Sequence, residues 1–317
     1  MRTRPATHVA TDDVVQPFSI ERADVRGRLV RLGPALDGVL AGHAYPEAVA
    51  TLLGELLVVA VASAGALKFQ GTLSLQTSSD GPVPLMIAEY RAPGGDEGDT
   101  APARLRGYAR FDGPKVAAAL QDGPVEHSTM QRLLGKGSLA FTVEPTPGAE
   151  RYQGVTALEG PSIVESVHAY FRQSEQLDAA IRVDVGGVTR MDGSGRSQWR
   201  AGGVLIQRMP GKNYLERNDD EWRRALALVG SSGRFDLLDP TLSARDTLHL
   251  LFPEDDLRAF DPVAVEARCR CSRERVDMVL RSFPASEMAE MVVDGEIAVT
   301  CEFCHAHYRF VPADLGI

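Results

Sequence analysis

Four cysteines constrain the fold of this chain more than any other feature, because all of them lie in one C-terminal window. Cys269 and Cys271 belong to "RCRCSRERV", and Cys301 and Cys304 belong to "TCEFCHAHY". The pattern is C-x-C followed, after 29 residues, by C-x-x-C. Zinc prefers four tetrahedral ligands, and thiolates are favoured donors. The spacing predicts a site in which all four cysteines bind one Zn²⁺ ion per chain.

Spacing alone leaves other interpretations of these cysteines open. They would be unrelated buried residues if their pairing and their absence from residues 1–268 were accidental. "CEFCH" also matches the C-x-x-C-H haem-attachment motif, and C-x-x-C occurs in thioredoxin-like redox sites. The first would leave the C-x-C pair without a role, and the second requires a βαβ setting that is absent here. His305 and His307 are spare candidate ligands, which we expect to lie at the surface.

Composition and charge limit the class of protein and its partners. Of 317 residues, 44% are apolar and 24% are charged, which is typical of a globular protein. The net charge of −9 repels phosphate groups, so we expect neither nucleic acid nor an anionic membrane as a partner. The N-terminus lacks the apolar run of a signal peptide, which predicts a cytoplasmic protein. In that reducing compartment, cysteines serve as metal ligands or redox groups more often than as structural disulfides.

The sequence predicts an α+β fold whose largest part is a mixed α/β core at residues 18–215, after a disordered tail at residues 1–17. The apolar stretch 48–67 contains Glu55 and several small residues, so we expect a buried core helix rather than a membrane span. "FQGTLSLQT" alternates apolar and polar residues like a strand, and "SSDGPVP" predicts a hairpin connection after it. The acidic segment 92–103 predicts an exposed loop.

Residues 216–262 predict a metastable helical linker. Asp220 and Gly230 mark the expected ends of its first helix, and Asp239 before Pro240 marks the expected start of a second. Isolated helices of this length are marginal in water, so we expect both to dock on the core. Their apolar residues are candidates for binding client proteins after undocking: Trp222, Leu226, Val229, Leu248, Leu251 and Phe252.

Residues 263–317 predict a small zinc-binding unit with a hairpin around Asp294 and Gly295. A unit of this size is too small to be stable through its apolar core alone. Structural zinc contributes about 10–16 kcal/mol of folding free energy to such units. Peroxide or hypohalite can oxidise zinc-bound thiolates, so the site is either a permanent staple or a releasable switch.

The chain resembles the redox-regulated heat-shock chaperone family, the thirty-three-kilodalton bacterial holdases. The match is specific as a set of motifs over most of residues 107–317 and looser over residues 18–106. The segments that carry it are "CRCSRERV" (269–276), "CEFCHAHYRF" (301–310), "GKGSLAFTVE" (135–144), "YQGVTALEG" (152–160), "YFRQSEQL" (170–177), "AGGVLIQRMP" (201–210) and "LFPEDDLRAFDP" (251–262).

The resemblance implies an ATP-independent chaperone that is inactive while reduced and zinc-bound. Oxidation would then form the disulfides Cys269–Cys271 and Cys301–Cys304, release zinc, and unfold the linker and the zinc unit. It also implies that the oxidised protein is a homodimer, with client binding and dimerisation in the core, and that it binds unfolded proteins under oxidative and heat stress. His305 departs from the small polar residue expected after the last cysteine.

Two other function classes are weighed against this one. A protein-binding adaptor with a permanent zinc ribbon would need the same four ligands but no switch. Nucleic acid is disfavoured for it, because residues 260–317 hold ten acidic residues against six arginines. An enzyme is not expected, since "QRLLGKGS" lacks the first glycine of a phosphate-binding loop and no set of catalytic residues stands out.

Overall fold

Strands from most of the chain's length join in one large sheet. The computed structural model describes residues 12–65, 71–94, 101–124, 126–146, 148–176, 178–189, 197–209 and 219–316. The strand order is β7-β6-β3-β4-β5-β11-β1-β2-β9-β8, and β10 pairs with β1 beside this path. All pairings are antiparallel except that of β11 with β5. The strands are β1 (Val14–Ile20), β2 (Val25–Leu32), β3 (Thr72–Ser79), β4 (Leu85–Arg91), β5 (Ala103–Arg110), β6 (Gly137–Glu144), β7 (Tyr152–Ala157), β8 (Ala179–Thr189), β9 (Ser197–Arg208), β10 (Leu257–Ala259) and β11 (Val263–Ala267).

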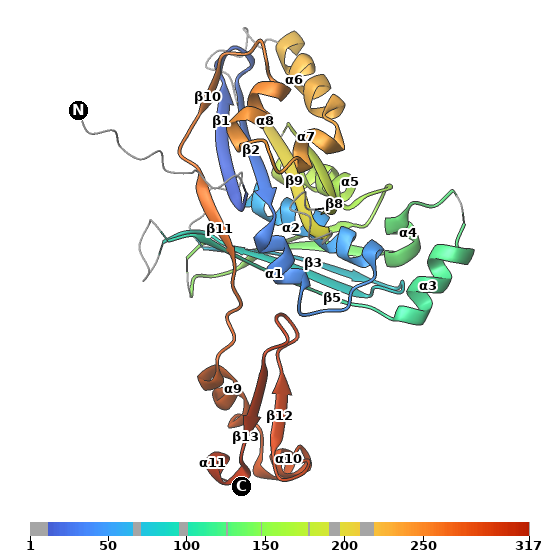
Figure 1. Ribbon diagram of the computed structural model, residues 1–317, viewed down its shortest axis with the longest axis vertical. Coiled ribbons are helices and arrows are strands. Elements are labelled where there is room, and N and C mark those ends of the chain that lie inside the picture. Colours follow the sequence, from blue (N-terminus) through green and yellow to red (C-terminus); the bar gives the residue numbers. More distant parts are fainter. Residues whose placement is uncertain are drawn as a thin grey trace, which may run out of the picture.

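Helix α2 (Glu47–Ala64) is the centre of the hydrophobic core. Figure 1 shows it between the two halves of the sheet, which explains why it is apolar on nearly every side. Gly54 allows β8 to approach closely, because a Cβ there would lie 2.7 Å from Val185 Cγ1. Among the described residues it is the one helix long and apolar enough to cross a membrane, yet 78% of that window is buried inside the protein. The predicted core helix is confirmed.

The shorter helices of the core lie at its periphery. Ser162 accepts the backbone N–H of Glu165 and caps the start of α5. The predicted hairpin at 78–84 connects β3 to β4. These short elements are the 3₁₀ turn η1 (Glu21–Ala23), α1 (Pro34–Leu40), α3 (Gly113–Asp122), α4 (Thr129–Leu134), α5 (Ile163–Tyr170) and the π turn η3 (Phe171–Glu175).

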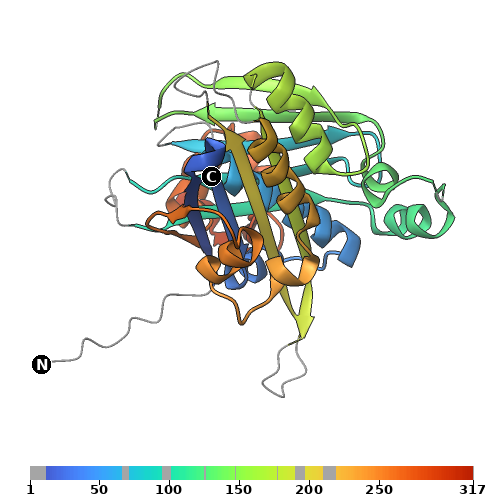
Figure 2. The same cartoon turned by 90° about the horizontal axis from the view of Figure 1, so that it is seen from above.

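The linker contributes three helices that cover the outer face of β1, β2 and β9. They are α6 (Asp219–Ser231), α7 (Arg234–Leu238) and α8 (Ala244–Leu251). Helices α6 and α7 lie against the yellow strands β8 and β9, and α8 lies against β1 and β2 (Figure 2). Phe252 packs on Phe18 of β1 with ring centroids 5.5 Å apart, within a second apolar cluster separate from that of α2. The predicted docking of the linker is present in the structure.

The C-terminal unit lies on the side of the sheet away from the linker helices (Figure 1). Five buried residues form its own core: Leu280, Met288, Ile297, Phe310 and Leu315. The predicted hairpin connects α10 to β12, with Asp294 and Gly295 in left-handed conformation and a bridge between Val293 and Glu296. Its elements are α9 (Arg273–Leu280), α10 (Ala285–Glu290), β12 (Ile297–Thr300), β13 (His307–Phe310) and α11 (Pro312–Leu315).

The structure corrects several predicted boundaries. Residues 14–17 are not part of a tail but begin β1, because Val14, Val15 and Phe18 are buried in the sheet. The linker helices number three rather than two. Helix α8 begins after Ser243 rather than at Asp239, whose carboxylate accepts the N–H of Thr241 instead. Residues 1–11, 95–100 of the predicted loop, and 216–218 lie outside the described residues.

Candidate metal centre

Two short loops bring the four cysteines together at the junction between the sheet and the C-terminal unit. The first loop follows β11 and ends at Ser272, whose side chain accepts the N–H of Arg275 and caps α9. The second loop connects β12 to β13. It is closed by two backbone bonds, from Cys301 N–H to Ala306 O (2.9 Å) and from His305 N–H to Cys301 O (2.8 Å). Backbone geometry therefore fixes both halves of the site.

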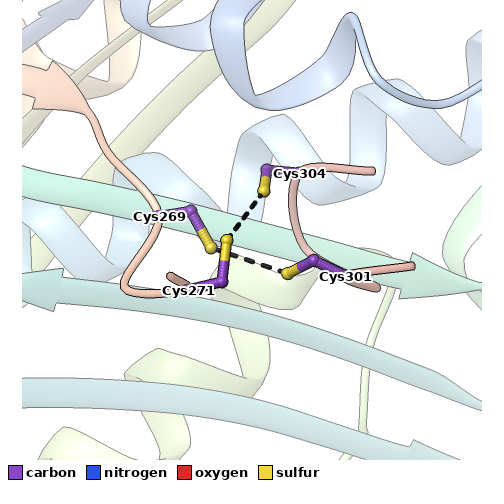
Figure 3. A group of neighbouring side chains, drawn as sticks. All are labelled: Cys269, Cys271, Cys301 and Cys304. Atoms are coloured by element: carbon purple, nitrogen blue, oxygen red, sulfur yellow. Dashed lines mark hydrogen bonds between the residues drawn. The ribbon is translucent and has the colours of Figure 1, made fainter. Parts of the chain in front are cut away.

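The sulfur positions fit a tetrahedral metal ion. All four Sγ atoms lie within 4.8 Å of one another. Two sulfur–sulfur contacts cross between the loops, at 3.7 Å for Cys269–Cys301 and 3.3 Å for Cys271–Cys304 (Figure 3). Four thiolates bound tetrahedrally at about 2.3 Å from Zn²⁺ would place their sulfurs about 3.8 Å apart. The arrangement matches this spacing, so the cluster can hold a metal ion of the zinc type.

The thiols differ in acidity. Burial opposes ionisation of Cys269, but hydrogen bonds from the Cys271 backbone and from the neighbouring thiols lower the pKa of Cys269 to about 7. Burial raises the pKa of Cys301 and of Cys304. Cys269 therefore loses its proton more readily than Cys301 or Cys304 does. A divalent cation would displace the thiol protons, because metal ligation requires the deprotonated form.

Two side chains outside the cysteine motifs support the cluster. The hydroxyl of Tyr308 on β13 donates to Cys271 Sγ at 3.1 Å, and this bond raises the pKa of Tyr308 to about 12. Arg106 comes from β5 of the core. Burial lowers the pKa of Arg106, but bonds to Glu89 and to the neighbouring Cys269 raise this pKa above its usual value. Such outer partners orient metal ligands and tune their basicity.

The two histidines beside the site do not join it. The His305 ring packs edge-on against His43 of the core, with centroids 4.0 Å apart. His307 Nδ1 lies 2.8 Å from Thr300 Oγ1. Both side chains are exposed, as predicted. In the described part of the chain, the four cysteines alone form a group that could hold a metal ion.

Sequence patterns did not reveal the contacts between the cysteine loops and the core. Arg270, between Cys269 and Cys271, forms an ion pair with Glu89 of β4 at 2.5 Å. Phe303, between Cys301 and Cys304, lies under the guanidinium of Arg106, 4.1 Å from Cζ to the ring centroid. The sequence offered one indication of these contacts. A charged and an aromatic residue stand between the metal ligands, although zinc binding itself requires neither residue.

The candidate client-binding residues of the linker all face the core. Trp222 and Leu226 are partly buried, and the other four, Val229, Leu248, Leu251 and Phe252, are buried. They share one cluster with Phe18 and Ile20 of β1. In the docked linker most of this apolar surface is therefore covered, and the binding role of these residues stays a prediction that requires undocking.

Comparisons with known proteins agree over nearly the whole chain. A family model described as "Hsp33 protein" matches residues 13–311. A "33 kDa chaperonin" of Caulobacter vibrioides is 43% identical over 302 residues, which cover 95% of each chain. Proteins of the same name from Pseudomonas syringae and Shewanella loihica are 36% and 34% identical, covering 96% of this chain and 92% and 94% of theirs.

A solved structure shares the fold. The crystal structure of the 33 kDa chaperonin from Thermotoga maritima matches with a TM-score of 0.74. The match covers 96% of this chain and 97% of that one at 20% sequence identity. The predicted mixed α/β architecture with a C-terminal four-cysteine cluster is confirmed.

Proposed function

The chain belongs to the Hsp33 family, and on this premise we propose that it is a redox-regulated, ATP-independent chaperone of the cytoplasm. It binds unfolding proteins after oxidation of its cysteines and has no enzymatic activity. The observation that carries the proposal is the four-thiol cluster within 4.8 Å, on a unit whose own core has only five buried residues. Such a unit depends on its ligands for stability.

In the reduced state, Cys269, Cys271, Cys301 and Cys304 would bind one Zn²⁺, which supplies folding free energy to residues 263–317 rather than catalysis. We propose a division between this switch unit, a linker at 216–262 and a core that was predicted at 18–215 and begins at Val14, with one addition. Strand β11 pairs with β5 and β1, so the switch unit is joined to the core by a strand of the core's own sheet.

Oxidation would convert the four thiols to the disulfides Cys269–Cys271 and Cys301–Cys304. In each step two thiols lose two protons and two electrons, and one peroxide is reduced to two waters. In the folded cluster the two pairs also contact each other, since Cys269 Sγ lies 3.7 Å from Cys301 Sγ and Cys271 Sγ lies 3.3 Å from Cys304 Sγ. Once the thiolate donors are gone, the small core is left without its staple and unfolds.

The docked linker is poised to follow. Its turns lie over two buried arginines, Arg31 and Arg200, which bond to Asp12 and to the backbone of the linker. Buried ion pairs contribute little net stability, because desolvation offsets most of the attraction. Undocking would expose the six apolar linker residues to unfolded clients. We expect the oxidised protein to dimerise, and to bind neither nucleic acid nor membranes.

The test treats zinc-loaded protein with peroxide at elevated temperature. Zinc release, free thiols and light scattering from a heat-labile client protein are measured together. We expect two disulfides, loss of one zinc per chain and suppressed aggregation, with the His307→Ala variant behaving like the wild type because it keeps all four thiols. Zinc release without any change in client aggregation would contradict the chaperone proposal. The adaptor alternative instead predicts slow zinc loss and an unchanged pattern of hydrogen exchange in the linker.

A further inference from the structure

The switch unit touches the core through the residues that stand between its cysteines. Figure 1 shows the tip of the β12–β13 hairpin directed at the core sheet. Phe303 at this tip lies against Arg106, with Tyr108 at 6.0 Å between ring centroids. Its carbonyl oxygen lies 3.3 Å from His43 Nε2. We call the core residues His43, Arg106 and Tyr108 the Phe303 seat.

The seat also recognises a negative charge beside the aromatic ring. Glu302 Oε1 lies 3.5 Å from the Arg110 guanidinium, and the hydroxyl of Tyr108 donates to the same oxygen at 3.5 Å. An arginine over an aromatic face and an arginine beside a carboxylate are complementary contacts for an acidic residue followed by an aromatic one. The core thus holds the dipeptide Glu302–Phe303 by both of its side chains.

The core builds this seat by itself. Glu89 on β4 receives two bonds from Arg106 on the adjacent strand, at 3.1 and 2.8 Å, which fix the guanidinium. His43 stacks on Tyr45 with centroids 4.6 Å apart, and the Tyr45 hydroxyl accepts the N–H of Ala109 on β5. These bonds lie within the core, although Glu89 also pairs with Arg270 of the switch unit. The seat therefore needs little reorganisation to bind a second ligand, which favours affinity.

We propose that Glu302–Phe303 is an internal stand-in for a client segment, and that the vacated seat binds segments in which an acidic residue precedes an aromatic one. This inference rests on the proposed function, since unfolding of the switch unit is what vacates the seat. Unfolded clients expose aromatic side chains that folded proteins bury. The chain thereby gains a client site on its core, distinct from the apolar linker face.

The first experiment uses oxidised full-length protein and a fluorescent peptide of residues 300–305 with serine in place of both cysteines. Fluorescence anisotropy measures its binding. We expect binding to the oxidised wild type and about tenfold weaker binding to Arg106→Gln, since the cation–π contact and the charge are lost. Arg104→Gln is the matched control, because Arg104 lies on the same face of β5 but pairs with Glu266. Peptides with alanine for phenylalanine or glutamine for glutamate should each bind more weakly to the unaltered protein.

The second experiment vacates the seat without oxidation. The Phe303→Ala variant keeps all four cysteines, and its zinc content is measured before use. We expect reduced, zinc-loaded Phe303→Ala to bind the peptide about tenfold more tightly than reduced wild type, in which Phe303 occupies the seat. The inference is overturned if reduced wild type and reduced Phe303→Ala bind the peptide equally. It is also overturned if oxidised wild type and oxidised Arg106→Gln bind it equally. The contact of Phe303 with the core would then only hold the switch unit in place.

The two proposals fail separately. If oxidised protein suppresses client aggregation but the peptide does not bind at Arg106, the seat is wrong and the chaperone function stands. If oxidation leaves aggregation unchanged while Phe303→Ala binds the peptide, the seat stands and the redox-switch proposal is wrong.

Discussion

At the scale of single residues, Tyr308 is the side chain outside the cysteine motifs with the clearest effect on the metal centre. The Tyr308→Phe substitution removes only the hydroxyl that donates to Cys271 Sγ. Outer partners of this kind contribute about tenfold to a hundredfold to metal affinity. We expect zinc to bind more weakly by that factor, measured by competition with a chromophoric chelator. Tyr152→Phe, an exposed tyrosine on β7, is the control. Equal affinities in all three proteins would remove Tyr308 from the site.

Glu55 is a second residue whose chemistry is set by its surroundings. It lies on α2, and burial raises the pKa of Glu55 to about 7 even though its carboxylate accepts the N–H of Val164. The folded protein therefore keeps the proton up to a higher pH than the unfolded chain does. This contribution to stability is fully present below pH 4.5 or so and is lost as the pH rises to about 7.

The Glu55→Gln variant should remove this pH dependence. Between pH 5 and pH 8 the wild-type core should lose on the order of 2–3 kcal/mol of unfolding free energy, and the variant should not. Urea unfolding followed by the fluorescence of Trp199, in a Trp222→Phe background, measures the core alone. Glu47→Gln, an exposed carboxylate on the same helix, should leave the slope unchanged. A wild-type midpoint that is flat over this range would be the contrary result.

At the scale of the element, α8 shows how little separates the docked linker from the undocked one. Its start depends on a reciprocal capping box, in which Ser243 Oγ accepts the N–H of Asp246 and Asp246 accepts the N–H of Ser243. Ser243→Ala should destabilise the helix by about 1 kcal/mol. We expect hydrogen exchange in α8 to accelerate about fivefold while exchange in α2 is unchanged. Ser231→Ala removes a serine at the end of α6 and should have no such effect.

Local sequence signals predict some of these elements correctly and fail for others. Alternation in β3 and the Asp294–Gly295 turn are local patterns, and the structure follows both. Asp239 and Ser243 are both good helix starts. Asp239 instead begins a turn, in which its carboxylate accepts the N–H of Thr241 and its carbonyl accepts a bond from Arg31. Gly230 lies inside α6 rather than after it, because nothing forces the chain to leave the helix there.

The metal centre could also be predicted only in part from the sequence. Its four ligands follow from spacing, since each pair is local and zinc needs four donors. The roles of Arg270 and Phe303 do not, because their partners Glu89 and Arg106 lie more than 150 residues away in sequence. Tertiary pairing of this kind is invisible to periodicity.

At the scale of the whole molecule, β11 decides where the core ends. It lies between β5 and β1 and connects the two halves of the large sheet, with Val265 only 4% exposed. Sequence patterning placed these residues in the switch unit. Its partner strands, which begin at residues 103 and 14, are far away along the chain, so no local signal announces the pairing.

Two truncated chains, ending at residue 262 and at residue 267, test this role. Both lack the cysteines, so their difference reports β11 alone. Burying a valine contributes about 1.5–3 kcal/mol, and for a chain of this size each kcal/mol corresponds to about 2–4 °C in Tm. The longer chain should therefore melt about 3–12 °C higher when unfolding is followed by Trp199 fluorescence. Equal melting temperatures would mean that β11 is carried by the switch unit and leaves the sheet with it. A higher value for the longer chain would mean that β11 stays in the sheet when the switch unit unfolds. The oxidised protein would then keep an intact sheet and, with it, the Phe303 seat. Only the cysteine loops beyond Ala267 would separate from the core.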